Sequence, residues 1–230
     1  MERVMHETCI EYFQRRLSEG WKCISLEGYN AVLQSPEGII RPIDLRNDVE
    51  TLRPSGVGDV TTIPTLFGAA THWEAVDDAG GGDDDATYVE HRSVSPGWLY
   101  DLYALANTAL VGETINSVTI YIRCRIAWPG NLGQARTVIK TNAVEYRGTP
   151  VTLSVAYGLS SKVYVLNPET EGAWTPALIN ALQPGVDLLQ QVIKEWANPR
   201  CTQVYAEVDN TPVVAIPRYG FVNFQDPGMV

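Results

Sequence analysis

One stretch in the middle of the chain decides its fold: Ser117-Val118-Thr119-Ile120-Tyr121-Ile122-Arg123-Cys124-Arg125-Ile126. From Val118 onward, every second residue is apolar, and the residues between carry hydroxyl, aromatic or cationic side chains. Successive side chains of a β-strand point to opposite faces, so a period of two indicates a strand with one face in a core. The sequence therefore predicts a long strand in a half-buried sheet.

Shorter stretches of the same kind lie on both sides of it, between Arg53 and Asp209, separated by turns rich in Gly, Pro and Asp. We expect strands near residues 60–63, 86–91, 99–106, 115–126, 135–141, 151–155, 160–166 and 202–209. Short strands at irregular intervals favour two packed antiparallel sheets, and we predict a β-sandwich of the jelly-roll type. Pro176 suits the start of a helical turn over 175–182, whereas residues 188–196 fit either a helix or a strand.

The N-terminal region follows a different pattern. Apolar residues recur at spacings of three and four from Val4 to Leu17, which predicts an amphipathic helix over residues 1–20 that ends at Gly20. Three short strands of a small β-meander are expected next, at residues 21–26, 29–34 and 39–45. Because so small a unit is marginally stable alone, we expect it to dock on the next domain or on a neighbouring subunit.

Pro and Gly residues between Leu52 and Asp59 interrupt the pattern and predict a domain boundary at Arg53. The expected organisation is a docking arm over residues 1–52, a β-sandwich over 53–210 and a C-terminal arm over 211–230. The segment Val213–Phe224 contains Pro217 and little charge, which suits an arm that lies on a neighbouring subunit.

The composition describes a globular chain of 230 residues, with 45% hydrophobic and 19% charged residues. No apolar run approaches the roughly 20 residues needed to cross a bilayer. The net charge of −10, with dispersed Lys and Arg, argues against nucleic-acid binding, which requires cations to neutralise phosphates. The N-terminus lacks the apolar core of a secretion signal, so we expect synthesis in the cytoplasm without export by that route.

The cysteines form no C-x-x-C pair, which argues against a zinc knuckle; they are Cys9, Cys23, Cys124 and Cys201. Cys124 lies on the apolar face of its strand. Cys201 is out of phase with Val204 and the alternate apolar residues after it, so we expect it to point away from the core. A bridge between the two is disfavoured unless a bulge shifts the register, and we expect free, mostly buried thiols.

One acidic segment is a candidate ligand for Ca²⁺: Asp77-Asp78-Ala79-Gly80-Gly81-Gly82-Asp83-Asp84-Asp85. Its spacing departs from an EF-hand loop, because no Glu stands at the twelfth position. The other interpretation is a solvated loop in which glycines turn the chain and aspartates keep it soluble. We favour the solvated loop and predict no metal site and no cofactor.

The sequence contains no recognisable catalytic constellation. Histidine occurs at His6, His72 and His91, and the G-x-S-x-G nucleophile elbow is absent. His72 stands beside Trp73, where a packed loop residue is favoured over a general base. Nothing selects two carboxylates for glycoside hydrolysis. We therefore predict no catalytic residue and a protein that is not an enzyme.

Aromatic residues near predicted strand ends and loops are the remaining candidates for binding: Trp98, Tyr100, Tyr103, Trp128, Tyr157 and Trp174. Such rings serve as stacking platforms for sugars, as anchors at protein interfaces, or as filling for the ends of a sandwich core. For any single ring we favour the core, and we expect some of them to face a partner.

The order of several short motifs resembles that of uncharacterised phage and prophage structural proteins over about residues 53–209. The motifs are Leu52-Arg53-Pro54 with Gly58-Asp59, His72-Trp73-Glu74-Ala75-Val76-Asp77, Asp83-Asp84-Asp85-Ala86-Thr87-Tyr88-Val89, Asp101-Leu102-Tyr103, Ile115-Asn116-Ser117-Val118-Thr119-Ile120-Tyr121, Asn167-Pro168 leading to Trp174-Thr175, Ala181-Leu182-Gln183-Pro184-Gly185-Val186, and Gln203-Val204-Tyr205-Ala206-Glu207-Val208-Asp209.

This resemblance implies a non-enzymatic virion component made in the host cytoplasm, such as a capsid-decoration, tail or fibre-associated protein. Its expected partners are copies of itself and a capsid or tail protein, with no nucleic acid and no membrane. The alternative is a carbohydrate-binding β-sandwich module used in surface adsorption, which predicts an open cleft lined by aromatic rings.

Overall fold

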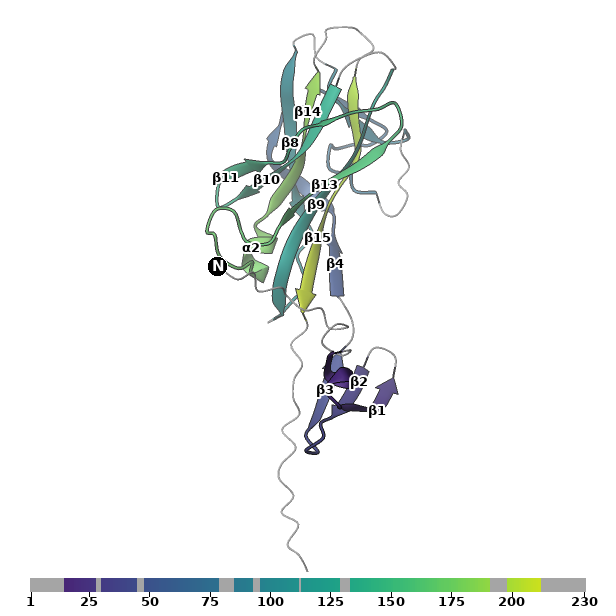
Figure 1. Ribbon diagram of the computed structural model, residues 1–230. Helices are drawn as coiled ribbons and strands as arrows, with labels where there is room; N and C mark the ends of the chain where they lie inside the picture. Colours follow the sequence, from purple (N-terminus) through teal and green to yellow (C-terminus); the bar gives the residue numbers. More distant parts are fainter. Residues whose placement is uncertain are drawn as a thin grey trace, which may run out of the picture. The chain divides into compact units, whose positions relative to one another are not determined.

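The computed structural model describes residues 15–27, 30–44, 48–78, 85–92, 96–111, 113–128, 133–190 and 198–211. The chain divides into two compact units (Figure 1), one of residues 1–47 with 212–230 and one of residues 48–211. The division falls before Asp48 rather than at Arg53, because residues 48–52 form a strand of the larger unit. No helix in the described part of the chain is long and apolar enough to cross a membrane.

The smaller unit contains an antiparallel meander of β1 (Lys22–Glu27), β2 (Asn30–Gln34) and β3 (Ile40–Asp44). Residues 15–18 before it are helical, and Gly20 follows them with φ 89°, the left-handed conformation that ends a helix. The rest of the expected helix, residues 1–14, lies outside the described residues. The predicted meander is therefore present, and so is the end of the predicted helix.

The larger unit is a sandwich of two antiparallel sheets, which confirms the predicted fold class (Figure 1). The first sheet contains β5 (Pro54–Thr61), β8 (Gly97–Leu105), β14 (Gln183–Gln190), β10 (Gly133–Thr141), β11 (Val144–Arg147) and β12 (Val151–Thr152). The second contains β4 (Asp48–Leu52), β6 (Thr65–Phe67), β7 (Tyr88–Glu90), β15 (Pro199–Thr211), β9 (Thr114–Ile126) and β13 (Gly158–Tyr164).

The pairing of the longer strands follows a jelly-roll order. One set runs β4-β15-β9-β13, and the other runs β8-β14-β10-β11 with β5 added beside β8. The first and last strands of the series, β4 and β15, pair with each other, and successive strands mostly alternate between the two sheets. This is the double Greek-key arrangement of a jelly roll.

β9 has the alternation that its sequence predicts. From Val118 to Ile126 its apolar residues lie in the core at 2% exposure or less, and its other face is half-buried. Both sheets contribute to two clusters of buried side chains: Ile120 of β9 and Ile139 of β10 share one, and Ile122 of β9 and Leu188 of β14 share the other. The core therefore runs between the sheets along β9.

A short helix, α2 (Pro176–Asn180), occupies the predicted helical turn. The hydroxyl of Thr175 accepts a hydrogen bond from the Leu178 amide at 3.3 Å and caps its first turn. The strand that follows, β14, accounts for the ambiguous segment as far as Gln190, and residues 191–197 lie outside the described part.

Cys201 lies in the core, and the expectation that it points away is wrong. A register shift between Cys201 and Gln203 inserts one residue into β15, so that Cys201 pairs directly with Cys124 of β9. Cys201 is fully buried in the same cluster as Cys124. The three described cysteines are free thiols, of which Cys23 is exposed, as the prediction of free, mostly buried thiols requires. Cys9 lies outside the described residues.

Candidate functional site

His72 lies in a tight turn at residues 71–76 that precedes β7. The Thr71 amide and hydroxyl both donate to Glu74 Oε2, at 2.9 and 2.8 Å. This is half of a capping box, in which a Glu three residues along satisfies the first amide of a turn. The Ala75 amide closes the turn on the Thr71 carbonyl at 3.3 Å. Hydrogen bonds within the turn therefore stabilise its conformation, in addition to any contact with the sheets.

Asp101 of β8 holds the imidazole of His72. His72 Nδ1 lies 2.6 Å from Asp101 Oδ2, and the Tyr103 hydroxyl donates to the same oxygen at 3.4 Å. Asp101 Oδ1 accepts from the Thr62 and Ile63 amides at 2.7 and 3.0 Å. A fully buried carboxylate needs such donors to offset its desolvation. Asp101 thus ties the turn, the segment after β5, and β8 together.

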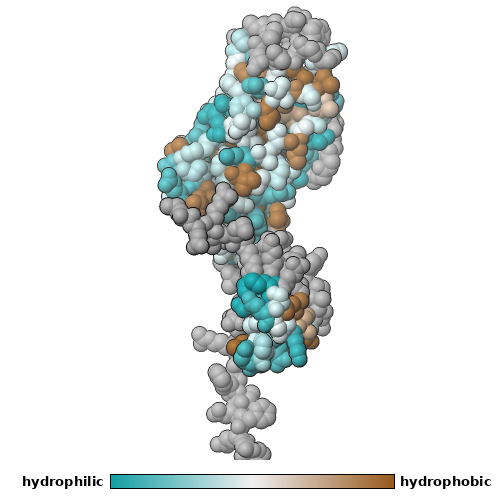
Figure 2. Space-filling view, viewed as in Figure 1, coloured by the Kyte–Doolittle hydropathy of each residue, from teal (hydrophilic) through white to brown (hydrophobic). Residues whose placement is uncertain are grey.

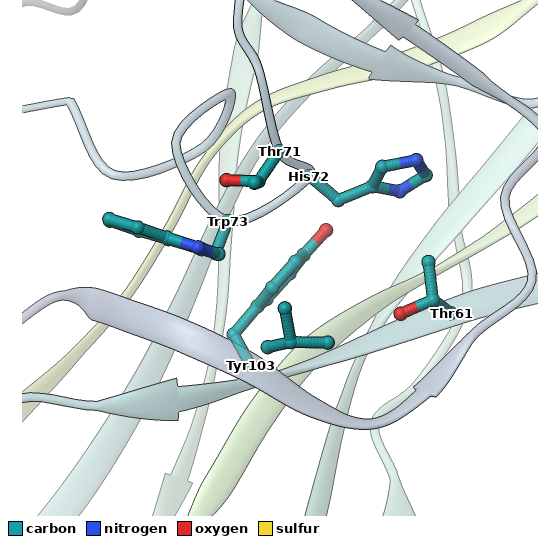
Figure 3. A pocket seen from close by; sticks show the side chains of 6 residues that line it. Thr61, Thr71, His72, Trp73 and Tyr103 are labelled. Atoms are coloured by element: carbon teal, nitrogen blue, oxygen red, sulfur yellow. The ribbon is translucent and has the colours of Figure 1, made fainter.

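A cavity of about 210 Å³ opens beside this network. It is lined by Val57, Thr61, Thr71, His72, Trp73 and Tyr103 (Figure 3). The Tyr103 ring stands between the turn and β8 with its hydroxyl toward His72 (Figure 3). Burial raises the pKa of Tyr103 well above its usual value, so its hydroxyl remains a donor.

The chemistry available here is limited. An imidazole oriented by a buried carboxylate can accept a proton at Nε2, as in a general base. The Thr71 hydroxyl in the cavity wall already donates to Glu74. Within the described residues no nucleophile is hydrogen-bonded to the imidazole of His72, whose side chain is 22% exposed in the cavity wall. The sequence carried no signal for the contact between His72 and Asp101, because this contact depends on how the turn packs against β8.

The acidic segment is described only at its ends, and Asp83 and Asp84 lie outside the described residues. Asp85 Oδ1 is bound by Arg125 at 2.6 Å, by Arg200 at 3.3 Å and by the Tyr157 hydroxyl at 3.2 Å. Asp77 forms a β-bridge with Gln203. In the ranges that the structure covers, no group of three or more His, Cys, Asp or Glu side chains could hold a metal ion. Asp85 thus works as an ion-pair partner of β9 and β15.

Most of the aromatic candidates are engaged by protein groups. Tyr103 and Trp174 are buried, and the Trp174 indole donates to the Tyr164 carbonyl at 3.0 Å. Three other rings each lie under a guanidinium: Trp98 under Arg136 at 4.0 Å, Tyr100 under Arg147 at 5.0 Å and Tyr157 under Arg125 at 5.0 Å. Trp128 is the most exposed of the six, at 52%. The sequence favoured a core position for any single ring, which holds for Tyr103 and Trp174, and it had no signal for the contacts with arginines.

Asp187 of β14 anchors two of these arginines. Its Oδ2 lies 2.7 Å from Arg136 and 3.3 Å from Arg147. Burial raises the pKa of Asp187 against the opposing effect of Arg136. Arg147 also bonds Glu145 at 2.9 Å, and Glu145 accepts from the Tyr100 hydroxyl at 2.9 Å. The outer face of this sheet is therefore a network of ion pairs and stacked rings.

The outer face of the second sheet combines apolar and aromatic groups. Leu159 and Val163 of β13 stand opposite Arg123 and Thr119 of β9, so they share the face of β9 that lies away from the core. Between those positions, Tyr121 stacks on Tyr205 of β15, with ring centres 4.7 Å apart.

Leu159 and Val163 are 52% and 50% exposed, and two apolar residues after β13, Val165 and Leu166, are 57% and 50% exposed. Figure 2 shows apolar residues of this kind scattered among polar ones over the visible face of the larger unit. We call these four residues the β13 patch.

Comparisons with known proteins give no family: no family model matches the chain, and no curated protein matches it. Among solved structures, the chain is similar to that of infectious bursal disease virus Gt strain, with TM-score 0.37, 11% identity and coverage of 82% of this chain and 42% of that one. It is similar to the ANXUR2 extracellular domain from Arabidopsis thaliana, with TM-score 0.33, 7% identity and coverage of 69% and 41%. The chain thus spans less than half the length of these two proteins.

A third similar structure is the Stig cyclase Fisc from Fischerella sp. TAU in complex with (3Z)-3-(1-methyl-2-pyrrolidinylidene)-3H-indole. Its TM-score is 0.34 and its identity 11%, and the match covers 82% of this chain and 93% of that one. At such TM-scores these likenesses add nothing to the assignment of function.

Proposed function

We propose that this protein is a non-enzymatic structural component of a virion, of the capsid-decoration, tail or fibre-associated kind. In this proposal it works by binding copies of itself and a capsid or tail protein. The resemblance of its motif series to phage structural proteins supports the virion assignment. The observation that carries the mode of action is the β13 patch.

The β13 patch has the character of a contact surface. β13 pairs with β9 on one side, and among the described strands it has no partner on the other, which makes it an edge strand. An edge strand offers unpaired backbone donors and acceptors to another chain, and proteins that remain monomeric usually protect such an edge with charge. Lys162, the charged residue of the strand, lies opposite Ile120, on the other face from Leu159 and Val163, so β13 places no charged side chain on its outer face. Exposed apolar groups along such an edge favour contact with a protein surface.

The arginine stacks favour protein contact over sugar binding. A sugar-binding platform needs an open ring face, and the rings of Trp98, Tyr100 and Tyr157 each have one face under a guanidinium. Carbohydrate binding remains the second candidate because Trp128 is an aromatic residue with 52% exposure. Titration with glycans would distinguish the two: saturable binding by a monomeric chain would favour the carbohydrate module.

The β13 patch can be tested with Leu159→Lys combined with Val163→Lys. We expect the unchanged protein to self-associate at micromolar concentration in sedimentation velocity, and the double variant to sediment as a monomer with an unchanged melting temperature. Val144→Lys is the matched control, because Val144 is an exposed apolar residue of an edge strand in the other sheet. This control should associate like the unchanged protein.

Two results would contradict the proposal. The first is that the unchanged protein stays monomeric and does not bind particles assembled from the products of its neighbouring genes. This result would contradict the contact function. Neighbouring genes that encode no capsid, portal or tail protein would remove the virion assignment while leaving the β13 patch as a contact surface.

A further inference from the structure

Two buried thiols face each other across the two longest strands of the sandwich. Cys124 of β9 and Cys201 of β15 are directly paired in the antiparallel register. They are 2% and 0% exposed and belong to one core cluster. Because residues directly opposite in a ladder project to the same face, both side chains enter the core side by side.

The local geometry suits a bond between the two sulfurs. Directly opposed residues of an antiparallel pair have Cα atoms roughly 4.5–5.5 Å apart. Disulfides span Cα separations of about 4.4–6.8 Å, a range that includes this separation. Cys201 Sγ lies 3.3 Å from the Gln203 carbonyl across the bulge. This bulge brings Cys201 into phase with Cys124.

We propose that Cys124 and Cys201 are a redox pair that forms a disulfide between β9 and β15 when the chain folds in the presence of a small disulfide, R–S–S–R. One thiolate attacks R–S–S–R, forms a mixed disulfide and releases R–S⁻. The second thiolate attacks the protein sulfur of that mixed disulfide, forms the Cys124–Cys201 bond and releases the second R–S⁻. Two S–H bonds are lost, one S–S bond forms, and the two electrons reduce R–S–S–R to two R–SH.

The burial of the two cysteines determines at which stage of folding they can be oxidised. Burial raises the pKa of Cys124, which lowers its thiolate fraction in the folded chain. Oxidation of the native protein is therefore slow, and the bond forms readily only while β9 and β15 are still coming together. The bond would close a loop of about 77 residues, from 124 to 201, and should raise the melting temperature by roughly 5–10 °C. The inference does not depend on the proposed function.

The experiment uses the full chain with Cys9→Ser and Cys23→Ser, so that Cys124 and Cys201 are the two thiols that remain. The reduced, unfolded chain is refolded in mixtures of oxidised and reduced glutathione, then alkylated, digested and read by mass spectrometry without reduction. We expect a monomer that has lost two hydrogens, carries no alkyl group and yields a peptide linking residues 124 and 201. Adding dithiothreitol should lower its melting temperature to that of the reduced chain.

Cys201→Ser in the same background is the matched control, since its hydroxyl can keep the contact with the Gln203 carbonyl. This variant should retain one alkylatable or glutathionylated cysteine, and dithiothreitol should leave its melting temperature unchanged. Three results for the chain that keeps both Cys124 and Cys201 would each overturn the inference if they hold across the whole glutathione range. They are two free thiols, two glutathione adducts, or a disulfide-linked dimer after refolding.

Discussion

At the residue scale, His91 is a buried imidazole with one satisfied nitrogen. Its Nε2 lies 2.9 Å from the Gly97 carbonyl, so this nitrogen carries the proton, and Nδ1 is buried with no hydrogen-bond partner in the described structure. Burial is the main cause that lowers the pKa of His91 below its usual 6.5. A second proton would place a charge at the unpartnered Nδ1, so the folded chain keeps His91 neutral.

His91 should therefore make the fold less stable in acid. Below about pH 6.5 the unfolded chain binds a proton at His91 that the folded chain refuses, so stability falls as the pH drops, by up to about 1.4 kcal/mol per pH unit. His91→Gln keeps a donor for the Gly97 carbonyl and takes up no proton. We expect its melting temperature to fall less than that of the unchanged protein between pH 7.5 and 5. Equal slopes for the two proteins would mean that His91 is charged or accessible in the folded state.

The element scale shows what the sequence could and could not predict. β9 was predictable because its alternation runs without a break from Val118 to Ile126. β14 was not, because Pro184 and Gly185 are poor strand formers and yet lie within it. A Cβ on Gly185 would stand 1.9 Å from the Asp101 carbonyl oxygen, so the glycine is required by the close approach of β8. That requirement exists only once the sheet has formed. The same holds for the site, where His72 and Asp101 meet through the sheet and not through spacing in the sequence.

The two faces of β9 should differ sharply in their tolerance of charge. Ile122→Asp places a carboxylate between the sheets at a fully buried position, which costs several kcal/mol, a large part of the total stability of a domain. Thr119 lies on the other face, opposite Glu207, so Thr119→Lys gains an opposite charge across the strands and should change stability by less than about 1 kcal/mol. Urea unfolding followed by circular dichroism measures both. Similar urea midpoints for the two variants would show that the two faces of β9 do not differ in burial.

At the scale of the whole molecule, the larger unit needs a strand that the sequence assigned to the N-terminal arm. β4 pairs with β15 from Leu52 opposite Ala206 to Asp48 opposite Asn210. Leu52 is 3% exposed in the core, and Glu50 accepts a hydrogen bond from the Ala109 amide at 2.8 Å. The change of pattern at Pro54 marks the passage from one sheet to the other, not the end of a domain. β4 and β5 are successive strands of opposite sheets, and a boundary read from turn residues alone falls between them.

A chain of residues 48–211 should consequently fold stably, and a chain of residues 53–211 should be much less stable or aggregate. The shorter chain loses the ladder between β4 and β15, the buried Leu52 side chain and the carboxylate of Glu50, and it exposes the backbone edge of β15. Losing a core leucine alone costs roughly 2–5 kcal/mol, so we expect the 53–211 chain to melt at least about 10 °C lower or to aggregate. Calorimetry of the two purified chains makes the comparison, with Leu52→Ala in the longer chain as a control of intermediate stability. Equal melting temperatures for both chains would place β4 with the N-terminal unit and return the boundary to Arg53.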